Sequence, residues 1–517
     1  MSRTNPSKPS DAVDVCLVSP PSRASSRTVP FALLNLSGWV EARGYTTELV
    51  EVKQPRHFPA YQTLSAAEKH RGMCETTERV LASKARMVGI TAVTSDFSDA
   101  VELARLIRKR SNVTLVVGGV HARIAPEDFL AAADSPIDIV VVGDGEETLT
   151  ELLARQRDGS PALESIAGLV YRDQAGGIVH TPPRAQLIDR SAAPLTPYHK
   201  LDMSFYLYPH RGLLREVLLS GVHVFTSYGC PFACTFCANR VRKVSFRPLE
   251  HVIEEIKQLR NVYGADGFYI QDETFFIKPK HVIEFCERLE AEKLGMVWGA
   301  ESRVNQIPDA VFAALKRAGC IQIDFGVESG SQPALDRMKK GIKVADTERV
   351  FASCHRHHIR TYANILFNTP GETEQDVTDT ISLMERLKAD GYGVNLTVPL
   401  LGTQIYEQYV KPPLRIEEYD LFDRSYDAII DSRFRLAMHR LKLELILEQT
   451  RARFGMWHRF KIFCAHPAYL SSLWRSARKR EYLRVALTEP FSNMPGPRRL
   501  VKRILNGIRL KAKWMRV

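Results

Sequence analysis

The most constraining feature of this sequence is a regular alternation between short β-branched runs and longer amphipathic stretches. In the first part of the chain, strand-like runs occur at 13–19, 47–52, 87–91, 114–117 and 137–142, with helical periodicity at 31–43 and 97–110. Strands that are joined through helices lie parallel, with the helices on both faces of the sheet. The pattern therefore predicts an α/β chain whose first domain, residues 1–157, is doubly wound and Rossmann-like.

Glycines follow two of these predicted strands, at the edge where a parallel sheet binds its ligands. Gly118 and Gly119 follow the fourth run, and Gly143 and Gly145 follow the fifth. A residue without Cβ lets the backbone approach a flat or anionic ligand closely, although a tight turn alone also accounts for such glycines. The sequence thus predicts a ligand site at this edge and leaves the ligand open.

A second alternation begins after a connector at 158–215, which contains several prolines and little clear period. Strands are predicted at 222–226, 267–271, 296–300, 322–327, 360–367 and 394–398, with helices at 251–263, 280–292, 309–318 and 374–388. About six βα units result, which predicts a second parallel domain over 216–400. The remainder, 401–517, is predicted to be a mainly helical C-terminal extension.

Three of the nine cysteines stand within eight positions, in the segment SYGCPFACTFCANR. Cys230, Cys234 and Cys237 have the spacing Cys-x3-Cys-x2-Cys, which suits three irons of a cubane and leaves the fourth iron open for a small ligand. A structural zinc site would need a fourth protein ligand nearby, and none stands at a suitable spacing. The odd total and the scatter of the others indicate a metal site in a reducing compartment, not a disulfide framework.

The segment CPFACTFC closely resembles the signature of the radical S-adenosylmethionine (SAM) enzymes, including an aromatic residue, Phe236, directly before the last cysteine. The resemblance implies a partial (β/α)6 TIM barrel and a [4Fe–4S] cluster on the three cysteines. It also implies that the open iron chelates SAM, which reduction cleaves to a 5′-deoxyadenosyl radical. An external electron donor of the flavodoxin or ferredoxin type is then expected.

Polar residues stand at the predicted carboxyl ends of the barrel strands, where parallel barrels place their active sites. They are Asp272, Glu273, Glu301, Arg303 and Glu328. The same resemblance implies that Asp272 or Glu273 accepts a hydrogen bond from the SAM amino group. It further implies that Glu301 and Arg303 reach the SAM carboxylate or ribose and that Glu328 also contacts SAM. Solvated ion pairs at strand ends are the alternative interpretation of each residue alone.

The first domain resembles the cobalamin-binding domain that precedes many radical SAM cores. The resemblance covers roughly residues 13–157 and rests on LVSPP, VVGGVHARIAPEDFL and VVVGDGEETL. The implied contacts to cobalamin are Thr94, Ser95, Gly118, Gly119, His121, Gly143, Gly145 and Glu146. The Asp-x-His-x-x-Gly signature that supplies a lower axial histidine in many such domains is absent, so bound cobalamin is expected to lack that ligand. For His121, packing within its loop is the alternative to ligand binding.

Together the resemblances imply a cobalamin-dependent radical SAM enzyme that methylates an unactivated carbon of a small or hydrophobic substrate. One SAM would supply the methyl group through cobalamin, and another the radical that takes a substrate hydrogen. Two alternatives stay open. One is a cyclase or oxidative rearrangement of the kind found in anaerobic porphyrin-ring formation, and the other is a non-catalytic corrinoid or iron–sulfur carrier. Acids placed to bind SAM argue against a carrier.

The formal charge of +12 is concentrated in the C-terminal tail. Residues 433–517 contain 21 Lys and Arg against four Asp and Glu, so the tail carries +17 and the rest of the chain −5. Aromatic residues interleave with these cations, namely Trp457, Phe460, Phe463, Tyr469, Trp474 and Trp514. This combination favours contact with an anionic membrane surface, and hence a lipid or other hydrophobic substrate. Two alternatives stay open. The tail could bind nucleic acid, although the chain has no recognised nucleic-acid-binding module, or it could form a helical cap over the barrel mouth.

No apolar run approaches the 18 or so residues that span a bilayer, and the polar N-terminus lacks the apolar region of a signal peptide. The sequence therefore predicts a cytoplasmic protein with peripheral contact to the inner face of the membrane.

Overall fold

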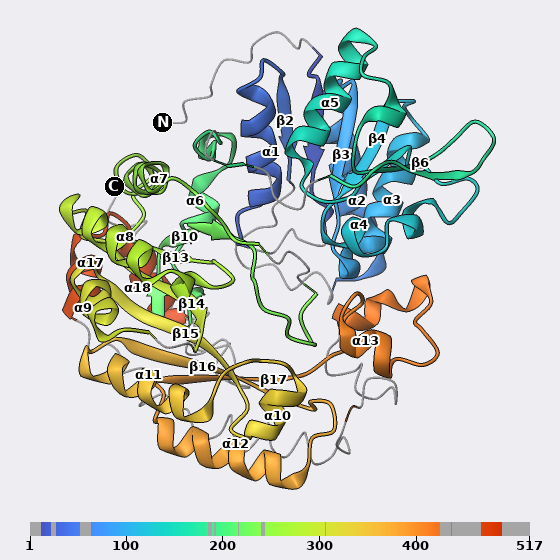
Figure 1. Cartoon of the computed structure of the whole chain (residues 1–517). Helices are drawn as coiled ribbons and strands as arrows, with labels where there is room; N and C mark the ends of the chain where they lie inside the picture. Colours follow the sequence, from blue (N-terminus) through green and yellow to red (C-terminus); the bar gives the residue numbers. More distant parts are fainter. Residues whose placement is uncertain are drawn as a thin grey trace.

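The computed structural model describes residues 12–21, 27–51, 64–184, 189–190, 193–215, 217–238, 243–304, 307–423, 436 and 467–488. The described chain forms two α/β units that lie side by side (Figure 1). Each unit is built around its own sheet, and helices pack on the sheets. The α/β class predicted from the alternation is therefore confirmed.

The first sheet has the strand order β2-β1-β3-β4-β5-β6-β7. Its parallel part consists of β1 (Val15–Val18), β2 (Thr47–Val50), β3 (Met87–Thr91), β4 (Thr114–Gly118) and β5 (Ile139–Val141). Alternate strand residues face opposite sides, so Leu17 packs with helices α1 (Phe31–Glu41) and α5 (Gly145–Asp158). Val18 packs on the other face with α2 (Ala66–Ala82) and α3 (Phe97–Arg108). The predicted doubly wound domain is present.

This sheet extends beyond residue 157, the limit predicted from the sequence. Strands β6 (Leu169–Arg172) and β7 (Ile178–His180) continue it in antiparallel orientation within the predicted connector. Asp173 forms the turn between them, because its carboxylate accepts hydrogen bonds from the backbone N–H groups of Ala175 and Gly177. Strands this short carry too little periodicity to be recognised without their neighbours.

The second sheet is the predicted partial barrel, with six parallel strands in the order β10-β13-β14-β15-β16-β17. These are β10 (Gly221–Val224), β13 (Gly267–Ile270), β14 (Val297–Arg303), β15 (Cys320–Glu328), β16 (Arg360–Phe367) and β17 (Gly391–Leu396). The connecting helices are α7 (Leu249–Asn261), α8 (Pro279–Ala291), α9 (Asp309–Arg317), α11 (Val344–Arg356) and α12 (Glu374–Leu387), and they pack on its outer face (Figure 1). The first and last strands are not paired with each other, so the barrel is open on one side.

A hairpin closes the amino-terminal end of the barrel. Its strands, β8 (His210–Leu214) and β9 (Val217–Leu219), send leucines into a cluster with side chains from β13, β14 and β15. Glycines make room for these leucines. A Cβ on Gly299 would lie 2.2 Å from Leu214 Cδ2, and one on Gly267 would lie 2.6 Å from Leu219 Cδ2. We call this side of the barrel the closed end.

The described part of the tail packs on the closed end. Helices α17 (Pro467–Arg475) and α18 (Lys479–Thr488) meet the buried Asp266, whose carboxylate accepts hydrogen bonds from Ser476 Oγ (2.7 Å) and Tyr482 OH (3.1 Å). Tyr469 OH donates to Leu218 O (2.8 Å). These helices therefore do not cap the barrel mouth. Trp457, Phe460, Phe463 and Trp514 lie outside the described residues.

A strap of chain after β17 returns to the first domain, a contact that the sequence did not predict. It comprises α13 (Gln404–Tyr409) and the short helix η8 (Ile416–Asp423). Tyr406 and Tyr419 are buried in the core between the first sheet and α3, and Tyr419 OH donates to Asp128 Oδ2 (2.8 Å). The start of the predicted extension thus joins the two domains.

In the part of the chain that the structure describes, no helix is both long and apolar enough to cross a bilayer.

Replacing Gly299 by Ala should destabilise the barrel, because the new Cβ would overlap Leu214 in a closely packed end. We expect a loss of about 1–3 kcal/mol in the free energy of unfolding, measured by urea denaturation. The control is Gly72→Ala in α2, where the nearest atom would be Pro21 Cβ at 3.7 Å. It should leave stability unchanged or raise it by up to about 1 kcal/mol. Equal effects of the two changes would contradict the packing described here.

Candidate functional site

The three cysteines lie on one loop at the carboxyl end of the barrel strands, which we call the mouth. The loop follows β10 and the short strand β11 (Ser227–Tyr228). Cys230 is half-buried, Cys234 is buried and Cys237 is exposed, and none of the three forms a disulfide. Cys234 and Cys237 are both near enough to Cys230 to influence it electrostatically. Among the described residues, no group of three or more His, Cys, Asp or Glu side chains is placed to hold a single metal ion. A cubane cluster does not require three ligands on one metal ion, because each thiolate binds its own iron.

Asp272 fixes the start of the cysteine loop. Its carboxylate is fully buried and accepts hydrogen bonds from Thr226 N (2.7 Å), Thr226 Oγ1 and Ser227 Oγ (2.8 Å). Burial raises the pKa of Asp272 to about 6, although these hydrogen bonds oppose the shift. Glu273, by contrast, is exposed and accepts from Gly229 N (3.0 Å), next to Cys230. Of the two acids considered for the SAM amino group, Glu273 is the one open to a ligand.

Arg303 is buried against the cysteine loop. Its Nη1 donates to Cys234 Sγ (3.1 Å), and its guanidinium lies 3.7 Å from the centre of the Phe232 ring. The Nε and Nη2 atoms are buried without a hydrogen-bond partner in the described structure. Unpaired buried donors cost free energy until an acceptor arrives, and a carboxylate is the acceptor that a guanidinium pairs with best. The residues at the mouth therefore fit a cluster together with the carboxylate of SAM.

Lys340 contacts both Glu328 and Phe236 beside the cysteine loop. Glu328 is buried, and it accepts a hydrogen bond from Lys340 Nζ (2.6 Å), which lies 5.8 Å from the centre of the Phe236 ring. The backbone of Glu328 has a φ of 65°, a strained conformation for a residue with a side chain. Strand β15 therefore ends, beside the cysteine loop, at a residue whose backbone conformation is strained.

Glu301 lies deeper in the barrel than Arg303. The two residues are two positions apart on β14 and so face the same side of the strand. The carboxylate of Glu301 accepts a hydrogen bond from Gln271 Nε2, and burial together with the charge of Asp324 raises its pKa to about 7. Glu301 is therefore a group that can hold or release a proton near neutral pH inside the barrel.

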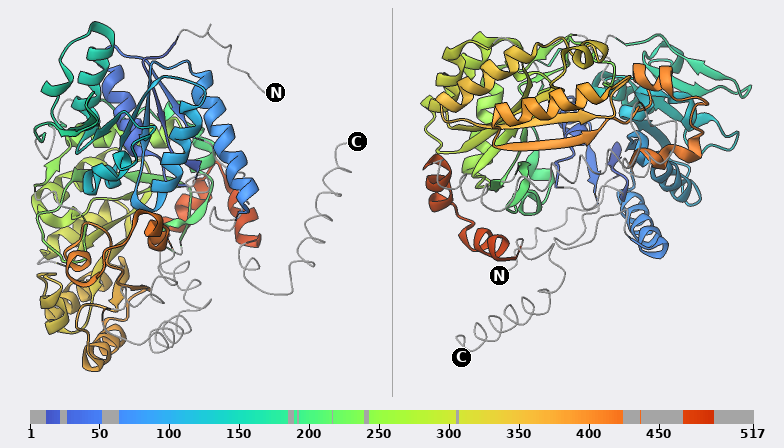
Figure 2. Two further views of the ribbon diagram at one scale, coloured as in Figure 1. Left: turned by 90° about the vertical axis from the view of Figure 1, so that its right-hand side faces the viewer. Right: turned by 90° about the horizontal axis from the view of Figure 1, so that it is seen from below.

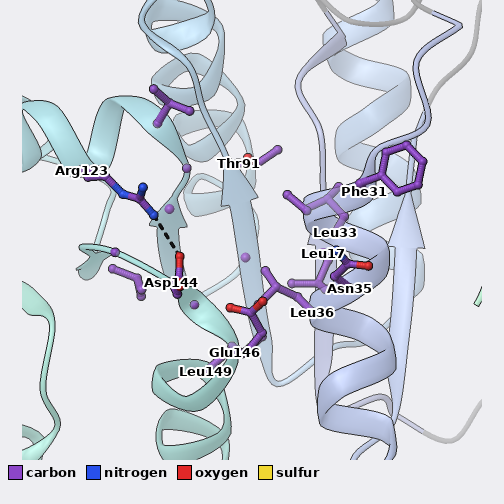
Figure 3. Close-up of a pocket in the computed structure, with 18 of the residues that line it drawn as sticks. Leu17, Phe31, Leu33, Asn35, Leu36, Thr91, Arg123, Asp144, Glu146 and Leu149 are labelled. Atoms are coloured by element: carbon purple, nitrogen blue, oxygen red, sulfur yellow. Dashed lines mark hydrogen bonds and ion pairs between the residues drawn. The ribbon is translucent and has the colours of Figure 1, made fainter. Parts of the chain in front are cut away.

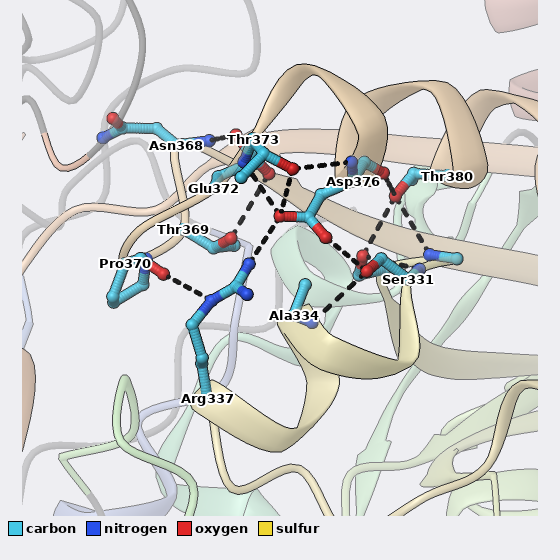
Figure 4. Close-up of polar contacts among 12 residues, drawn as sticks. Ser331, Ala334, Arg337, Asn368, Thr369, Pro370, Glu372, Thr373, Asp376 and Thr380 are labelled. Atoms are coloured by element: carbon cyan, nitrogen blue, oxygen red, sulfur yellow. Dashed lines mark hydrogen bonds and ion pairs between the residues drawn. The ribbon is translucent and has the colours of Figure 1, made fainter.

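A network of hydrogen bonds joins the loops that follow β15 and β16 (Figure 4). Asp376 accepts from Thr373 N (2.8 Å), Ser331 Oγ and Arg337 Nη2, so α12 is tied to α10 (Gln332–Arg337). Glu372 accepts from Asn368 N (2.8 Å), and burial raises its pKa to about 7. The segment NTPGET thus fixes loop geometry at the mouth.

Thr235, between two of the cysteines, connects the loop to both domains. Its N–H donates to Met338 O (3.0 Å) at the end of α10, and its carbonyl accepts from Ile405 N (3.2 Å) at the start of the strap. Because the strap is buried in the first domain, the cysteine loop is held in a fixed position relative to that domain as well as to the barrel.

A cavity of about 360 Å³ lies at the carboxyl edge of the first sheet, between α1 and α5 (Figure 3). Its walls are mainly apolar and comprise Leu17, Leu33, Leu36, Ile90, Val116, Val141 and Leu149. Phe225 and Tyr228 of the barrel complete it. Since Tyr228 is two residues from Cys230, the cavity and the cysteine loop lie together between the domains.

Gly118, Gly119, Gly143, Gly145 and Glu146 all line this cavity. Gly119 has a φ of 103°, and a Cβ there would lie 2.6 Å from Ala92 O. Gly143 has a φ of 106° with no atom within 4 Å of its absent Cβ. Glycine is therefore required at 119 for close approach of two loops, whereas at 143 it is favoured by the positive φ, since a Cβ there would meet open space.

Thr94, Ser95 and His121 are not among the residues that line the cavity. The His121 ring is fully buried against Phe97, Phe129 and Tyr419. Its Nδ1 lies 3.1 Å from Thr94 Oγ1, and its Nε2 lies 3.2 Å from Asp128 Oδ2. Both ring nitrogens thus lie against protein groups, although Nε2 has no hydrogen-bond partner in the described structure.

Arg190, which the sequence analysis missed, lies at the rim of the cavity. Its Nη1 donates to Glu146, its guanidinium lies 4.3 Å from the centre of the Tyr228 ring, and its buried Nε has no hydrogen-bond partner in the described structure. Arg123 donates to Asp144 Oδ1 (3.0 Å; Figure 3), and the other oxygen of that carboxylate lies 3.5 Å from Arg190 Nη2. An apolar slot with glycine edges and a polar rim fits cobalamin, a ligand with flat apolar parts and polar side groups.

Family models match both parts of the chain. The radical SAM superfamily model matches residues 224–384, and the B12 binding domain model matches residues 23–153. The chain is 32% identical over 326 residues to an uncharacterized methyltransferase of Pyrococcus horikoshii, which covers 62% of this chain and 68% of that protein. It is 24% identical over 458 residues to the anaerobic magnesium-protoporphyrin IX monomethyl ester cyclase of Rubrivivax gelatinosus, covering 87% of this chain and 76% of that protein.

The fold is similar to that of the radical SAM methyltransferase TsrM from Kitasatospora setae. The TM-score is 0.61 at 20% identity, and the match covers 77% of this chain and 76% of that one. That protein has been solved with cobalamin and a [4Fe–4S] cluster bound, and also with tryptophan substrate and a SAM analog.

Changing any one of Cys230, Cys234 or Cys237 to Ala should abolish formation of 5′-deoxyadenosine, because each thiolate holds one iron. The expected iron content of the reconstituted protein is about four per chain, and the variants should fall below it. Cys74→Ala is the control, since Cys74 lies half-exposed on α2 in the other domain. A triple variant that still bound about four irons and cleaved SAM would disprove the assignment.

Bound Co(II) cobalamin should give an EPR spectrum without nitrogen hyperfine splitting from the protein. No histidine is among the residues that line the cavity in the described structure, and both nitrogens of His121 face other groups. Clear coupling to a histidine nitrogen would refute this expectation. Failure to bind cobalamin would remove the methylation hypothesis.

Proposed function

Since this chain belongs to the radical SAM enzymes that carry a cobalamin-binding domain, we propose that it methylates an unactivated carbon of a small or hydrophobic substrate. Its cofactors are a [4Fe–4S] cluster, SAM and cobalamin. Bound together, these groups supply a radical that takes a hydrogen atom from carbon and a methyl group to replace it. The reaction needs an electron for the cluster, for which we propose a cytoplasmic donor of the flavodoxin or ferredoxin type.

The observation that carries this proposal is the shared boundary of the cavity and the cysteine loop. Tyr228 belongs to the cavity wall and stands two residues before Cys230, and Arg190 from the first domain packs on its ring. A methyl carrier in the cavity and a radical source at the mouth would then act on one substrate held between them. A protein that only carried cobalamin or an iron–sulfur cluster would not need the cavity and the cysteine loop to lie next to each other.

We assign the SAM contacts to side chains around the cysteine loop. Arg303 would pair with the SAM carboxylate through its two unpartnered donors, and Glu273 would accept from the SAM amino group. Glu328 and Phe236 would bound the same space from the other side. Asp272 would act indirectly, by holding the loop in place.

We assign the cobalamin contacts to Gly118, Gly119, Gly143, Gly145 and Glu146, to which the structure adds Arg190. The apolar walls would exclude water from the face of the cofactor. Thr94, Ser95 and His121 would support the neighbouring loop without touching the ligand.

The substrate class rests on what similar proteins act on. By its name, the cyclase acts on a magnesium-protoporphyrin ester, which is a large ring system, and TsrM has been solved with tryptophan, an aromatic amino acid, as its substrate. The second candidate function is a cyclisation or oxidative rearrangement without methyl transfer. It is supported by the similarity to the cyclase, which extends over 87% of this chain.

Anaerobic reconstitution with iron, sulfide and hydroxocobalamin, followed by reduction with SAM present, distinguishes the two candidates. A methyltransferase should form both 5′-deoxyadenosine and S-adenosylhomocysteine, because loss of the methyl group from SAM leaves the latter. A cyclase should form 5′-deoxyadenosine alone. Omission of cobalamin is the control and should abolish S-adenosylhomocysteine only. If S-adenosylhomocysteine is absent from the complete reaction, the methylation proposal is wrong.

A further inference from the structure

The closed end of the barrel displays apolar side chains to solvent. Of the nine large hydrophobic residues that are exposed in the described structure, four lie here. They are Val262 at the end of α7 (69% exposed), Leu470 (36%) and Trp474 (79%) on α17, and Leu483 (63%) on α18. Such a concentration of exposed apolar groups on one surface marks an interaction site more often than chance.

These side chains are exposed although their helices are already anchored. The inner face of α17 uses Tyr469, Ser472 and Ser476, which bond to Leu218 O, Asp266 O and Asp266 Oδ2. Leu470 and Trp474 are four residues apart and so lie together on a different face of the helix. Helix α17 therefore has one face that holds the barrel and a second, apolar face that is exposed, where Lys479 Nζ lies 5.1 Å from the centre of the Trp474 ring.

Cations surround this apolar surface. A cavity of about 260 Å³ between α17 and the ends of α8 and α9 is lined by Lys293, Arg317 and Arg475. A second, of about 580 Å³ beside Tyr263, is lined by Arg478, Lys479 and Arg480. The acids in the two linings are Glu290 and Glu481, and each is paired with an arginine, at 3.4 Å and 3.3 Å. The surface is thus strongly positive.

The charge continues along the chain beyond this surface. Residues 433–517 carry +17, whereas the preceding residues carry −5, and the chain leaves α18 at the closed end with cations up to Arg516 still to follow. Of this tail, the described residues 467–488 contain five Lys and Arg against one Glu, and they lie on the closed end.

We propose that the closed end of the barrel docks on an anionic membrane surface. Lys and Arg bind lipid phosphates at the headgroup level, while Trp and aliphatic side chains enter the interface below them. A nucleic acid would match the cations but would leave Val262, Leu470 and Leu483 without a partner. The docking surface does not depend on which reaction the enzyme performs.

Docking in this way sets the orientation of the active site. The cysteine loop follows the carboxyl end of β10, whereas α17 and α18 contact the residues that precede β10 and β13. Figure 1 and Figure 2 place both helices, in red, on the side of the barrel remote from the first domain. The mouth and the cobalamin cavity therefore face away from the bilayer, so that substrate enters from the aqueous side and membrane contact is separate from substrate choice.

Flotation of the reconstituted full-length protein with vesicles tests the proposal. Vesicles of phosphatidylcholine with phosphatidylglycerol are compared with phosphatidylcholine alone, at low and high salt. The wild type should float with the anionic vesicles at low salt, and high salt should reduce this binding. Truncation before α17 is unsuitable, because it would strip Tyr469 and Tyr482 from the barrel and expose buried apolar surface.

Two variants separate the apolar and the ionic contributions. The double change Trp474→Ala and Leu483→Ala, and the triple change Arg475→Gln, Lys479→Gln and Arg480→Gln, should each weaken partition by about tenfold or more. The matched control removes exposed apolar groups elsewhere, Ile178→Ala with Leu400→Ala, and should float as the wild type does. Circular dichroism checks that every variant is folded.

Three outcomes would overturn the proposal. The wild type does not float with anionic vesicles, or the Trp474 and Leu483 variant floats as well as the wild type, or the control loses as much binding as that variant. Binding of a duplex RNA or DNA that is insensitive to the apolar change, in place of vesicle binding, would assign the surface to nucleic acid instead.

Discussion

The buried carboxylate of Asp272 holds the loop that carries the three cysteines. It accepts hydrogen bonds from the backbone and side chain of Thr226 and from the side chain of Ser227, which lie between β10 and the first cysteine. Burying a charge is costly unless it is paired by such donors, so the loop and the carboxylate stabilise each other. The position of Cys230 relative to β13 and β14, and with it the contact between Cys234 and Arg303, depends on this arrangement.

Two further contacts make the same loop a junction between the domains. The backbone of Thr235 bonds to the strap that is buried in the first domain, and the ring of Tyr228 packs beneath Arg190 at the rim of the cavity. A reaction that combines a radical at the mouth with a methyl group from the cavity needs a fixed distance between them. The strap and Arg190 are the parts of this chain that fix it.

The two ends of the barrel have opposite properties. At the mouth, the buried and unpaired donors of Arg303 are available to a ligand, while Glu301 lies deeper in the barrel and accepts from Gln271. At the closed end, leucines of the β8–β9 hairpin fill the space that glycines leave, and α17 and α18 seal it. Because the closed end has no catalytic task, its outer surface is free to carry the exposed Trp474 and the surrounding cations.

The sequence by itself determined the features that depend on local order along the chain. Alternating periodicity predicted both parallel sheets, and several predicted strands, such as those at 87–91 and 360–367, agree with β3 and β16 at both ends. Cysteine spacing predicted the cluster loop, and the strand-end rule predicted that Glu273, Arg303 and Glu328 lie at the barrel mouth. Only the tertiary structure showed that Asp272 is buried while Glu273 is exposed, brought Arg190 to the cavity, and placed α17 and α18 at the closed end. These outcomes depend on burial and on contacts between residues far apart in sequence, such as Ser476 with Asp266, and local patterns carry no record of such contacts because they form only when the two sheets are assembled.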